Sequence, residues 1–175
     1  MSAPLNSPAR QSDVDQLPGE RRFISAGRPV RVPPGFVAIV EQGVVRLEVI
    51  HDDGSSAIIG FAGPGEGLVH HVDRFCHVHP VAHDDVMLEL VPIAAGDRVQ
   101  AALAARLHAS EAWLSMLARH GVAERLRALR QLLGSTPGLG LPLLRSLTRE
   151  QLAMATLSSR ASIARALRAL RDSGG

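Results

Sequence analysis

Side chains that bind metals or move protons crowd into one short segment of the sequence. The segment spans fourteen residues and contains His70, His71, Cys76, His77, His79 and His83. Imidazole and thiolate groups are good ligands for zinc, copper and haem iron. On a strand, His77 and His79 would lie on the same face. A metal or haem sensor is therefore one hypothesis. The other is that these are polar residues on exposed strand faces, with Cys76 a small core residue, and for the protein as a whole we predict neither a metal nor a cofactor.

An enzymatic interpretation of the same segment is disfavoured by its spacing. His77, His79 and Asp84 could imitate the facial triad of a cupin-like metal-dependent oxygenase. The cupin pattern places a glutamate about four residues after the second histidine, however, and His83 stands there. No Ser/His/Asp arrangement or phosphate-cradling loop is evident. We therefore predict that the protein is not an enzyme and has no catalytic residues.

Arginines near the C-terminus indicate a different chemistry. The spacing predicts a helix over about 160–171, with an apolar face of Ile163, Ala166, Leu167 and Leu170. The opposite face carries Arg160, Ala161, Ala164, Arg165 and Arg168. An arginine donates two parallel hydrogen bonds to N7 and O6 of guanine, and the alanines keep the helix slim enough to approach base edges. This face suits the major groove of double-stranded DNA.

A second short helix is expected immediately before this one. Thr148 and Gln151 form a capping box for a helix over about 149–155, and Ser158 or Ser159 caps the next helix. Two short helices with about three residues between them are the signature of a helix-turn-helix. Thr148, Ser159 and the helix N-termini can bind phosphate, and we assign Arg168 to phosphate as well.

Charge is divided unevenly along the chain. Residues 1–97 carry seven arginines and thirteen acidic residues, a net charge of −6, whereas residues 98–175 carry twelve arginines and four acidic residues, a net charge of +8. The chain has no lysine. A basic C-terminal part favours a polyanionic partner. No apolar run approaches about 18 residues and the N-terminus has no apolar signal region, so we expect a cytoplasmic protein that does not enter a membrane.

The remaining sequence predicts the elements that position these residues. Short apolar runs between Phe23 and about Pro92 predict strands, with a hairpin at 52–54 and turns at 33–35 and 63–65. Helices are predicted over about 98–118, opened by an Asp97–Gln100 capping box, and over about 122–133, followed by a loop over 134–140. We therefore expect an α+β protein with a flexible tail (1–21), an antiparallel β domain (22–96), a connecting helix (97–120) and a helix-turn-helix domain (121–175).

These motifs resemble the Crp/Fnr (cyclic-AMP receptor and fumarate–nitrate regulator) superfamily of transcriptional regulators. TREQLAMATLSSRASIARALRALRD is similar to the helix-turn-helix of that family, and VVRLEVIHDDGSSAIIGFAGPGE is similar to the core of its effector domain. The resemblance covers about Arg22 to Asp172. It implies a β-roll of the cyclic-nucleotide-binding jelly-roll type, a dimerisation helix and a winged helix. It also implies a homodimer on an inverted-repeat operator.

The resemblance carries the base-reading arginine of the family onto Arg160, a second groove residue onto Ala161 and another arginine onto Arg165. The family often has glutamate where Ala161 stands and glycine where Leu157 stands. The β-hairpin wing would follow Asp172, and the sequence ends at Gly175, so we expect a truncated winged helix.

The effector pocket departs from the cyclic-nucleotide pattern. Gly65 and Glu66 are present, but His77 to Pro80 occupy the region where cyclic-nucleotide binders place an arginine that neutralises the phosphate. We therefore expect no binding of cyclic AMP. His71 lies near the ligand histidine of the haem-containing branch of the family, and Arg74 to His77 resemble an effector-contacting run of its 2-oxoglutarate-sensing branch. The candidates for a pocket that takes a small-molecule effector are Gly65, Glu66, His71, Arg74 and His77.

Overall fold

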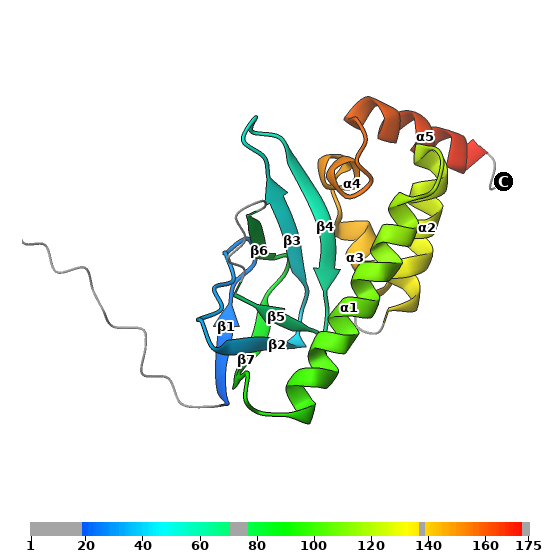
Figure 1. The fold of residues 1–175 in the computed structure, drawn as a ribbon. Helices are drawn as coiled ribbons and strands as arrows, with labels where there is room; N and C mark the ends of the chain where they lie inside the picture. Colours follow the sequence, from blue (N-terminus) through cyan, green and yellow to red (C-terminus); the bar gives the residue numbers. More distant parts are fainter. Residues whose placement is uncertain (1–18, 71–76, 137–138, 173–175) are drawn as a thin grey trace, which may run out of the picture.

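The chain folds into an antiparallel β-sandwich followed by helices (Figure 1). The computed structural model describes residues 19–70, 77–136 and 139–172. Their strands are β1 (Glu20–Ile24), β2 (Phe36–Gln42), β3 (Val45–Ile50), β4 (Ser56–Ala62), β5 (Gly67–Val69), β6 (Val78–Ala82) and β7 (Val86–Pro92). Their helices are α1 (Asp97–Leu117), α2 (Val122–Ser135), α3 (Gly140–Ser146), α4 (Arg149–Ala155) and α5 (Arg160–Asp172). The α+β class predicted from the sequence is confirmed, whereas the expected tail lies almost entirely outside the described residues.

Two sheets form the sandwich. One has the strand order β1-β7-β2-β5 and the other has the order β4-β3-β6, and every pairing is antiparallel. Their inner faces bury a core that includes Val40, Val45, Leu88 and Leu90. The β3–β4 hairpin turns at Gly54, whose φ of 80° favours glycine, as its Asp-Asp-Gly sequence predicts.

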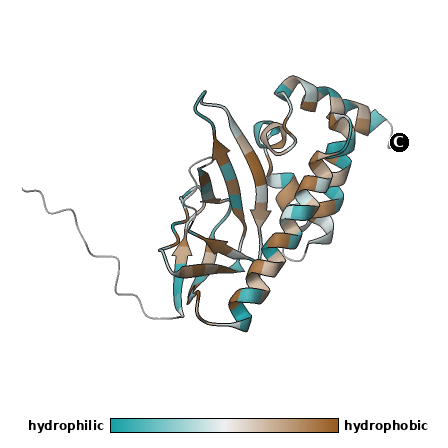
Figure 2. Ribbon diagram, viewed as in Figure 1, coloured by the Kyte–Doolittle hydropathy of each residue, from teal (hydrophilic) through white to brown (hydrophobic). Residues whose placement is uncertain are grey.

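A second core joins the sandwich to all the helices. It contains Ile58 and Phe61 of β4, Trp113 of α1, Leu129 of α2 and Ile163 of α5, together with residues of α3 and α4. Hydrophobic residues are concentrated in the strands and alternate with hydrophilic ones along the helices (Figure 2). The helices therefore share one core with β4, and the core crosses the domain boundary that we expect at residue 120.

The helices lie where the sequence predicts them, but some of their details differ from the prediction. The predicted helices over 149–155 and 160–171 are observed within one residue, and those over 98–118 and 122–133 within two. One prediction is wrong. Gly96 precedes α1 with no side-chain cap, so Asp97 lies in the first turn instead of forming a capping box. The region directly after the predicted loop over 134–140, for which we predict no element, forms α3, whose neighbouring residues Leu139 and Leu147 are buried in the shared core.

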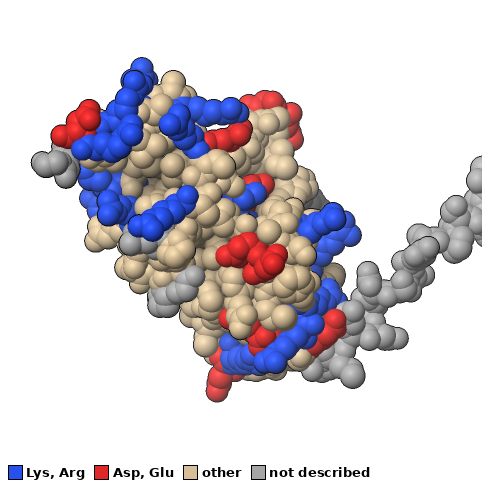
Figure 3. Space-filling view, turned by 180° about the vertical axis from the view of Figure 1, so that it is seen from behind, with Lys and Arg blue, Asp and Glu red and all other residues tan. Residues whose placement is uncertain are grey.

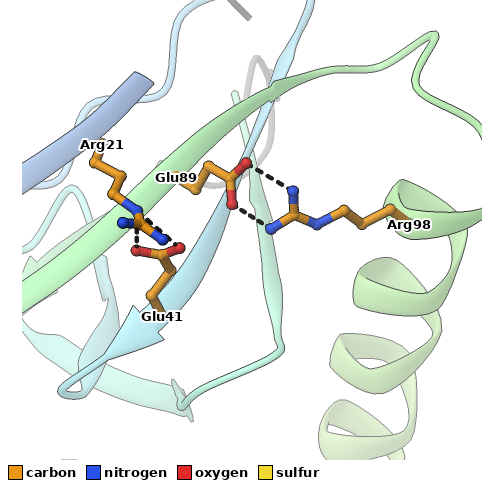
Figure 4. Close-up of polar contacts among 4 residues, drawn as sticks. All are labelled: Arg21, Glu41, Glu89 and Arg98. Atoms are coloured by element: carbon orange, nitrogen blue, oxygen red, sulfur yellow. Dashed lines mark hydrogen bonds and ion pairs between the residues drawn. The ribbon is translucent and has the colours of Figure 1, made fainter. Parts of the chain in front are cut away.

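One ion pair fixes the start of α1 against the sandwich, and a second one beside it joins two strands (Figure 4). Both terminal nitrogens of Arg98 donate to the carboxylate of Glu89 on β7, and Arg21 of β1 pairs with Glu41 of β2 at 3.0 Å. The hydrogen bonds from Arg98 hold the pKa of Glu89 below its ordinary value. This end of α1 is thus held against β7, which lies between β1 and β2 in the first sheet. Within the described ranges, no helix is both long and apolar enough to cross a membrane.

Candidate nucleic-acid interface

Helices α4 and α5 form the predicted helix-turn-helix, and side-chain caps begin both helices. The Thr148 hydroxyl accepts a hydrogen bond from the Gln151 amide at 3.1 Å, and the Gln151 side chain accepts one from the Thr148 amide at 2.8 Å. This confirms the capping box. Ser159 caps α5, because its hydroxyl accepts from the Ser162 amide at 3.1 Å. Ser158 bonds instead to the Thr156 hydroxyl.

The turn between the two helices contains a strained residue. Leu157 has a φ of 50°, in the left-handed region that favours glycine, and among the described residues it is the only non-glycine residue with positive φ. Its side chain is 56% exposed, so burial of the leucine offsets little of that strain. The turn therefore has the backbone conformation that favours glycine, although a leucine occupies this position.

Leu157→Gly is expected to raise the free energy of unfolding by about 0.5–1 kcal/mol. Glycine removes the steric conflict of the left-handed conformation, and its larger entropy in the unfolded chain offsets part of that gain. Urea denaturation of both proteins measures the difference. Leu157→Ala keeps a Cβ atom and serves as the control, so equal stabilisation by alanine and glycine would contradict this account.

The two faces of α5 are divided as its sequence predicts. Ile163 and Ala166 are buried, and Leu167 and Leu170 pack against the same core. The candidate DNA-binding residues Thr148, Ser159, Arg160, Ala161, Arg165 and Arg168 are all exposed. The structure therefore brings all six candidates to the surface of the helix-turn-helix.

Positive charge on this surface is only partly neutralised. Arg160 pairs with Glu150 of α4 at 2.5 Å, and both side chains are exposed. Arg165 donates to the Ser162 hydroxyl and Arg168 to the Ala164 carbonyl, and among the described residues neither forms an ion pair. The pairing of Arg160 with Glu150 could not be predicted, because the two residues lie on different helices.

A groove lined by arginine lies beside this surface. Arg149, Arg168 and Arg171, with Ala164 and Leu167, line a groove of about 610 Å³ between α4 and α5. Figure 3 shows arginines gathered at the end of the molecule formed by the C-terminal helices. Sequence analysis missed Arg149 and Arg171, although Arg171 follows Arg168 at the three-residue spacing of one helix face. The groove suits an anion such as a phosphate group.

The glutamate of the predicted effector pocket has an internal partner. Glu66 is buried after the turn at Gly65, and Arg106 of α1 donates to its carboxylate at 3.0 Å and to the Phe61 carbonyl at 2.8 Å. Burial raises the pKa of Glu66, and the charge and hydrogen bond of Arg106 oppose that rise. A Cβ atom on Gly60 would lie 2.6 Å from the Arg106 guanidinium, so glycine leaves the room that this arginine occupies. Glu66 is therefore engaged by the protein itself.

The described histidines of the short segment do not assemble a metal site. His71, Arg74 and Cys76 lie outside the described residues, and His77 is exposed, with its ring centroid 6.5 Å from that of His79. The Asp84 carboxylate accepts from the Val44 amide at 2.6 Å, a structural role. In the described part of the chain, no three His, Cys, Asp or Glu residues are placed to hold a metal ion.

His83 joins the sandwich to the helices. Its Nδ1 lies 3.3 Å from Arg46 of β3, and its Nε2 lies 2.7 Å from the hydroxyl of Ser146 in α3. Burial, aided by the charge of Arg46, lowers the pKa of His83. Because arginine can only donate, Nδ1 accepts and Nε2 carries the proton. The His83 ring therefore links β3 to α3, with both ring nitrogens engaged in these contacts.

Helix α1 presents an exposed stripe to solvent. Leu107 and Leu114 are 59% and 66% exposed and lie seven residues apart, with the exposed Ala104 three residues before Leu107 and the exposed Glu111 between the two leucines. A spacing of seven residues is that of a helix seam that packs against a second helix. The opposite face of α1 is buried against the sandwich and α2 through Val99, Ala102, Trp113 and Met116.

Solved structures share this architecture, whereas no protein-family model and no curated protein matches the sequence. A CRP-family transcriptional regulator from Thermus thermophilus, TTHB099, is 19% identical, with a TM-score of 0.70 over 87% of this chain and 85% of that one. FixK2 from Bradyrhizobium japonicum is 20% identical, with a TM-score of 0.67 over 90% and 87% of the two chains. The c-di-GMP responsive global regulator CLP from Xanthomonas campestris is 21% identical, with a TM-score of 0.66 over 89% and 88%. Together with the β-sandwich, the long α1 and the helix-turn-helix, these similarities show that the chain has the fold of the CRP/FNR transcriptional regulators.

Proposed function

We propose that the protein is a sequence-specific DNA-binding transcriptional regulator that acts in the cytoplasm and has no enzymatic activity. The observation that carries the proposal is the capped helix-turn-helix, whose outer surface bears Arg165 and Arg168 with no acidic partner among the described residues. The adjoining groove lined by Arg149, Arg168 and Arg171 adds positive charge to the same end of the molecule. The fold shared with transcriptional regulators supports the same conclusion.

We propose different roles for the exposed residues. Helix α5 enters the major groove with Arg160, Ala161 and Arg165 toward the base edges, where arginine recognises guanine. Arg168 and the N-terminus of α4 at Thr148 contact the phosphates that fix the register of the helix. The arginine groove beside α5 holds a further backbone phosphate. Sequence is thus read by the first half of α5, while affinity depends on the surrounding charge.

A homodimer fits this arrangement. The exposed stripe of α1, centred on Leu107 and Leu114, would pack against the same stripe of a second chain. Two recognition helices related by a two-fold axis would meet half-sites about one helical turn apart, so the operator is an inverted repeat. Cyclic AMP is not the proposed effector, because the Glu66 carboxylate already pairs with Arg106.

The direct test is selection of bound duplexes from a randomised pool at two salt concentrations, using the full chain. Recovery of a two-fold symmetric motif, bound more weakly at the higher salt, would support a dimeric sequence-specific regulator. Recovery of no enriched motif at either salt would overturn the proposal.

Substitutions of Arg160 and of Glu150 are expected to have opposite effects on the affinity for the selected duplex. Arg160→Ala removes a base contact and weakens binding by about 1–3 kcal/mol, with a smaller loss on random duplexes. Glu150→Gln removes a negative charge near the phosphates and releases Arg160, so binding to both kinds of duplex becomes tighter. Fluorescence anisotropy measures both, with Arg145→Ala of α3 as the control. Equal losses on selected and random duplexes for Arg160→Ala would contradict its base-reading role.

A further inference from the structure

A cleft at the end of the sandwich carries basic side chains that the proposed function does not use. It measures about 570 Å³ and lies between the end of β5, strand β6 and the segment 29–33 that precedes β2. That segment is tied to β6, because the Val30 amide donates to the Pro80 carbonyl at 2.8 Å and Pro29 bridges to Val81. Two walls of the cleft, the segment 29–33 and β6, are therefore joined by backbone pairing.

The ionisable side chains that the structure describes around this cleft are all basic. Arg22, Arg31, His70 and His79 line it, and none of the described lining residues is acidic. Arg22 pairs with Glu20 at 3.3 Å, outside the lining. The side chains of Arg31 and His79 form no hydrogen bond or ion pair with another described residue. Two arginines and two histidines thus line one cleft, and among the described residues Glu20 is the only carboxylate that pairs with any of them.

The walls between these polar groups are apolar. Val30 and Val32 of the segment before β2, Val69 of β5 and Val78 of β6 also line the cleft. The His70 ring is held in place because its Nδ1 donates to the Val32 carbonyl at 3.0 Å. Small-molecule sites combine this size and apolar lining with a few convergent polar groups. Guanidinium groups at such a site favour carboxylate or phosphate, to which they donate paired hydrogen bonds.

We infer that this cleft binds a small organic anion bearing carboxylate or phosphate groups, held by Arg22 and Arg31 with its carbon skeleton against the valines. The site is distinct from Glu66, which faces α1 and pairs with Arg106. It is also distinct from the DNA-binding surface, since β1 and β6 lie on the side of the sandwich away from α1 and α5 (Figure 1). The inference therefore does not depend on DNA binding.

Calorimetric titration without DNA tests the inference with two probes, citrate for carboxylates and pyrophosphate for phosphates. The titrations use an Arg168→Gln background, because the arginine groove of the helix-turn-helix would itself bind pyrophosphate. Sodium chloride at matched ionic strength controls for screening. We expect saturable binding of at least one probe, and the stronger of the two identifies the preferred anion.

Arg31→Gln locates the binding site. Arg31 is exposed, so its loss leaves the fold intact. Removal of one charged donor is expected to lower the affinity for the probe about tenfold. Arg28→Gln, in the same loop but outside the cleft, is the matched control and should bind as the background protein does. Absence of saturable heat for both probes, or equal binding by Arg31→Gln and Arg28→Gln, would overturn the inference.

Discussion

Arg106→Met is expected to lower the free energy of unfolding by about 3–5 kcal/mol at neutral pH, because it leaves the buried carboxylate of Glu66 without its partner. Glu66→Gln should lower it much less. The two carboxylate oxygens of Glu66 accept separately from the Gly63 amide and from Arg106, so glutamine keeps one of these two hydrogen bonds, and it removes the charge that burial disfavours. Arg106 also retains the Phe61 carbonyl as an acceptor.

The loss in Arg106→Met should depend on pH. Burial already raises the pKa of Glu66, and removal of Arg106 raises it further. A carboxyl group whose pKa is higher in the folded state favours folding when protonated, and this contribution is lost as the pH rises through the folded pKa. The deficit relative to the parent protein should therefore shrink as the pH falls from 8 toward about 4.

Urea denaturation across this pH range measures both effects. Arg119→Met, an exposed arginine just beyond α1, is the matched control. Equal losses in Arg106→Met and Glu66→Gln, or a deficit in Arg106→Met that does not change with pH, would show that this pair does not hold α1 to the turn after β4.

Leu129→Ala is expected to lower the free energy of unfolding by about 2–5 kcal/mol. Leu129 of α2 is fully buried in the core shared by β4 and all the helices, and its truncation leaves a cavity among rigidly packed neighbours. Because the core is shared, the sandwich and the helices should unfold together in the variant as in the parent protein.

Two probes test this cooperativity in urea. Fluorescence reports on Trp113, the single tryptophan, which packs against Phe61 at 5.7 Å between ring centroids, while far-ultraviolet circular dichroism reports on the backbone. Their transitions should coincide and shift by the same amount. Ile93→Ala, at an exposed position, should shift them little. A shift of the dichroism alone would mean that the helices unfold independently of β4.

The elements that the sequence predicted best are those determined by neighbouring residues. The start of α4 follows from Thr148 and Gln151, three residues apart, and the outer face of α5 follows from the apolar spacing of Ile163 and Leu167. The β3–β4 hairpin likewise follows from Gly54. In each case the residues that determine the structure lie within a few positions of one another, so a local sequence pattern predicts it.

The features that could not be predicted depend on distant residues. Helix α3 contains Gly140 and Pro142, which disfavour helix, and it is stabilised where Leu143 enters the shared core. Forty residues separate Glu66 from Arg106, and nothing near either one indicates the other. The cleft proposed to bind an anion combines β1, β5, β6 and the segment before β2. Because these segments are far apart in the sequence, the group of histidines did not indicate that Arg22 and Arg31 lie beside it.

The shared core bears on whether the helix-turn-helix is a separable module. A fragment beginning at Gly121 would keep α4 and α5 but lose Phe61, Trp113 and Met116, against which they and α2 pack. Such a fragment would expose apolar surface and be prone to aggregate. The same packing links α5 to β4 through α4, which contacts both. Grafting α4 and α5 onto another protein would therefore require a replacement for the face of β4 as well.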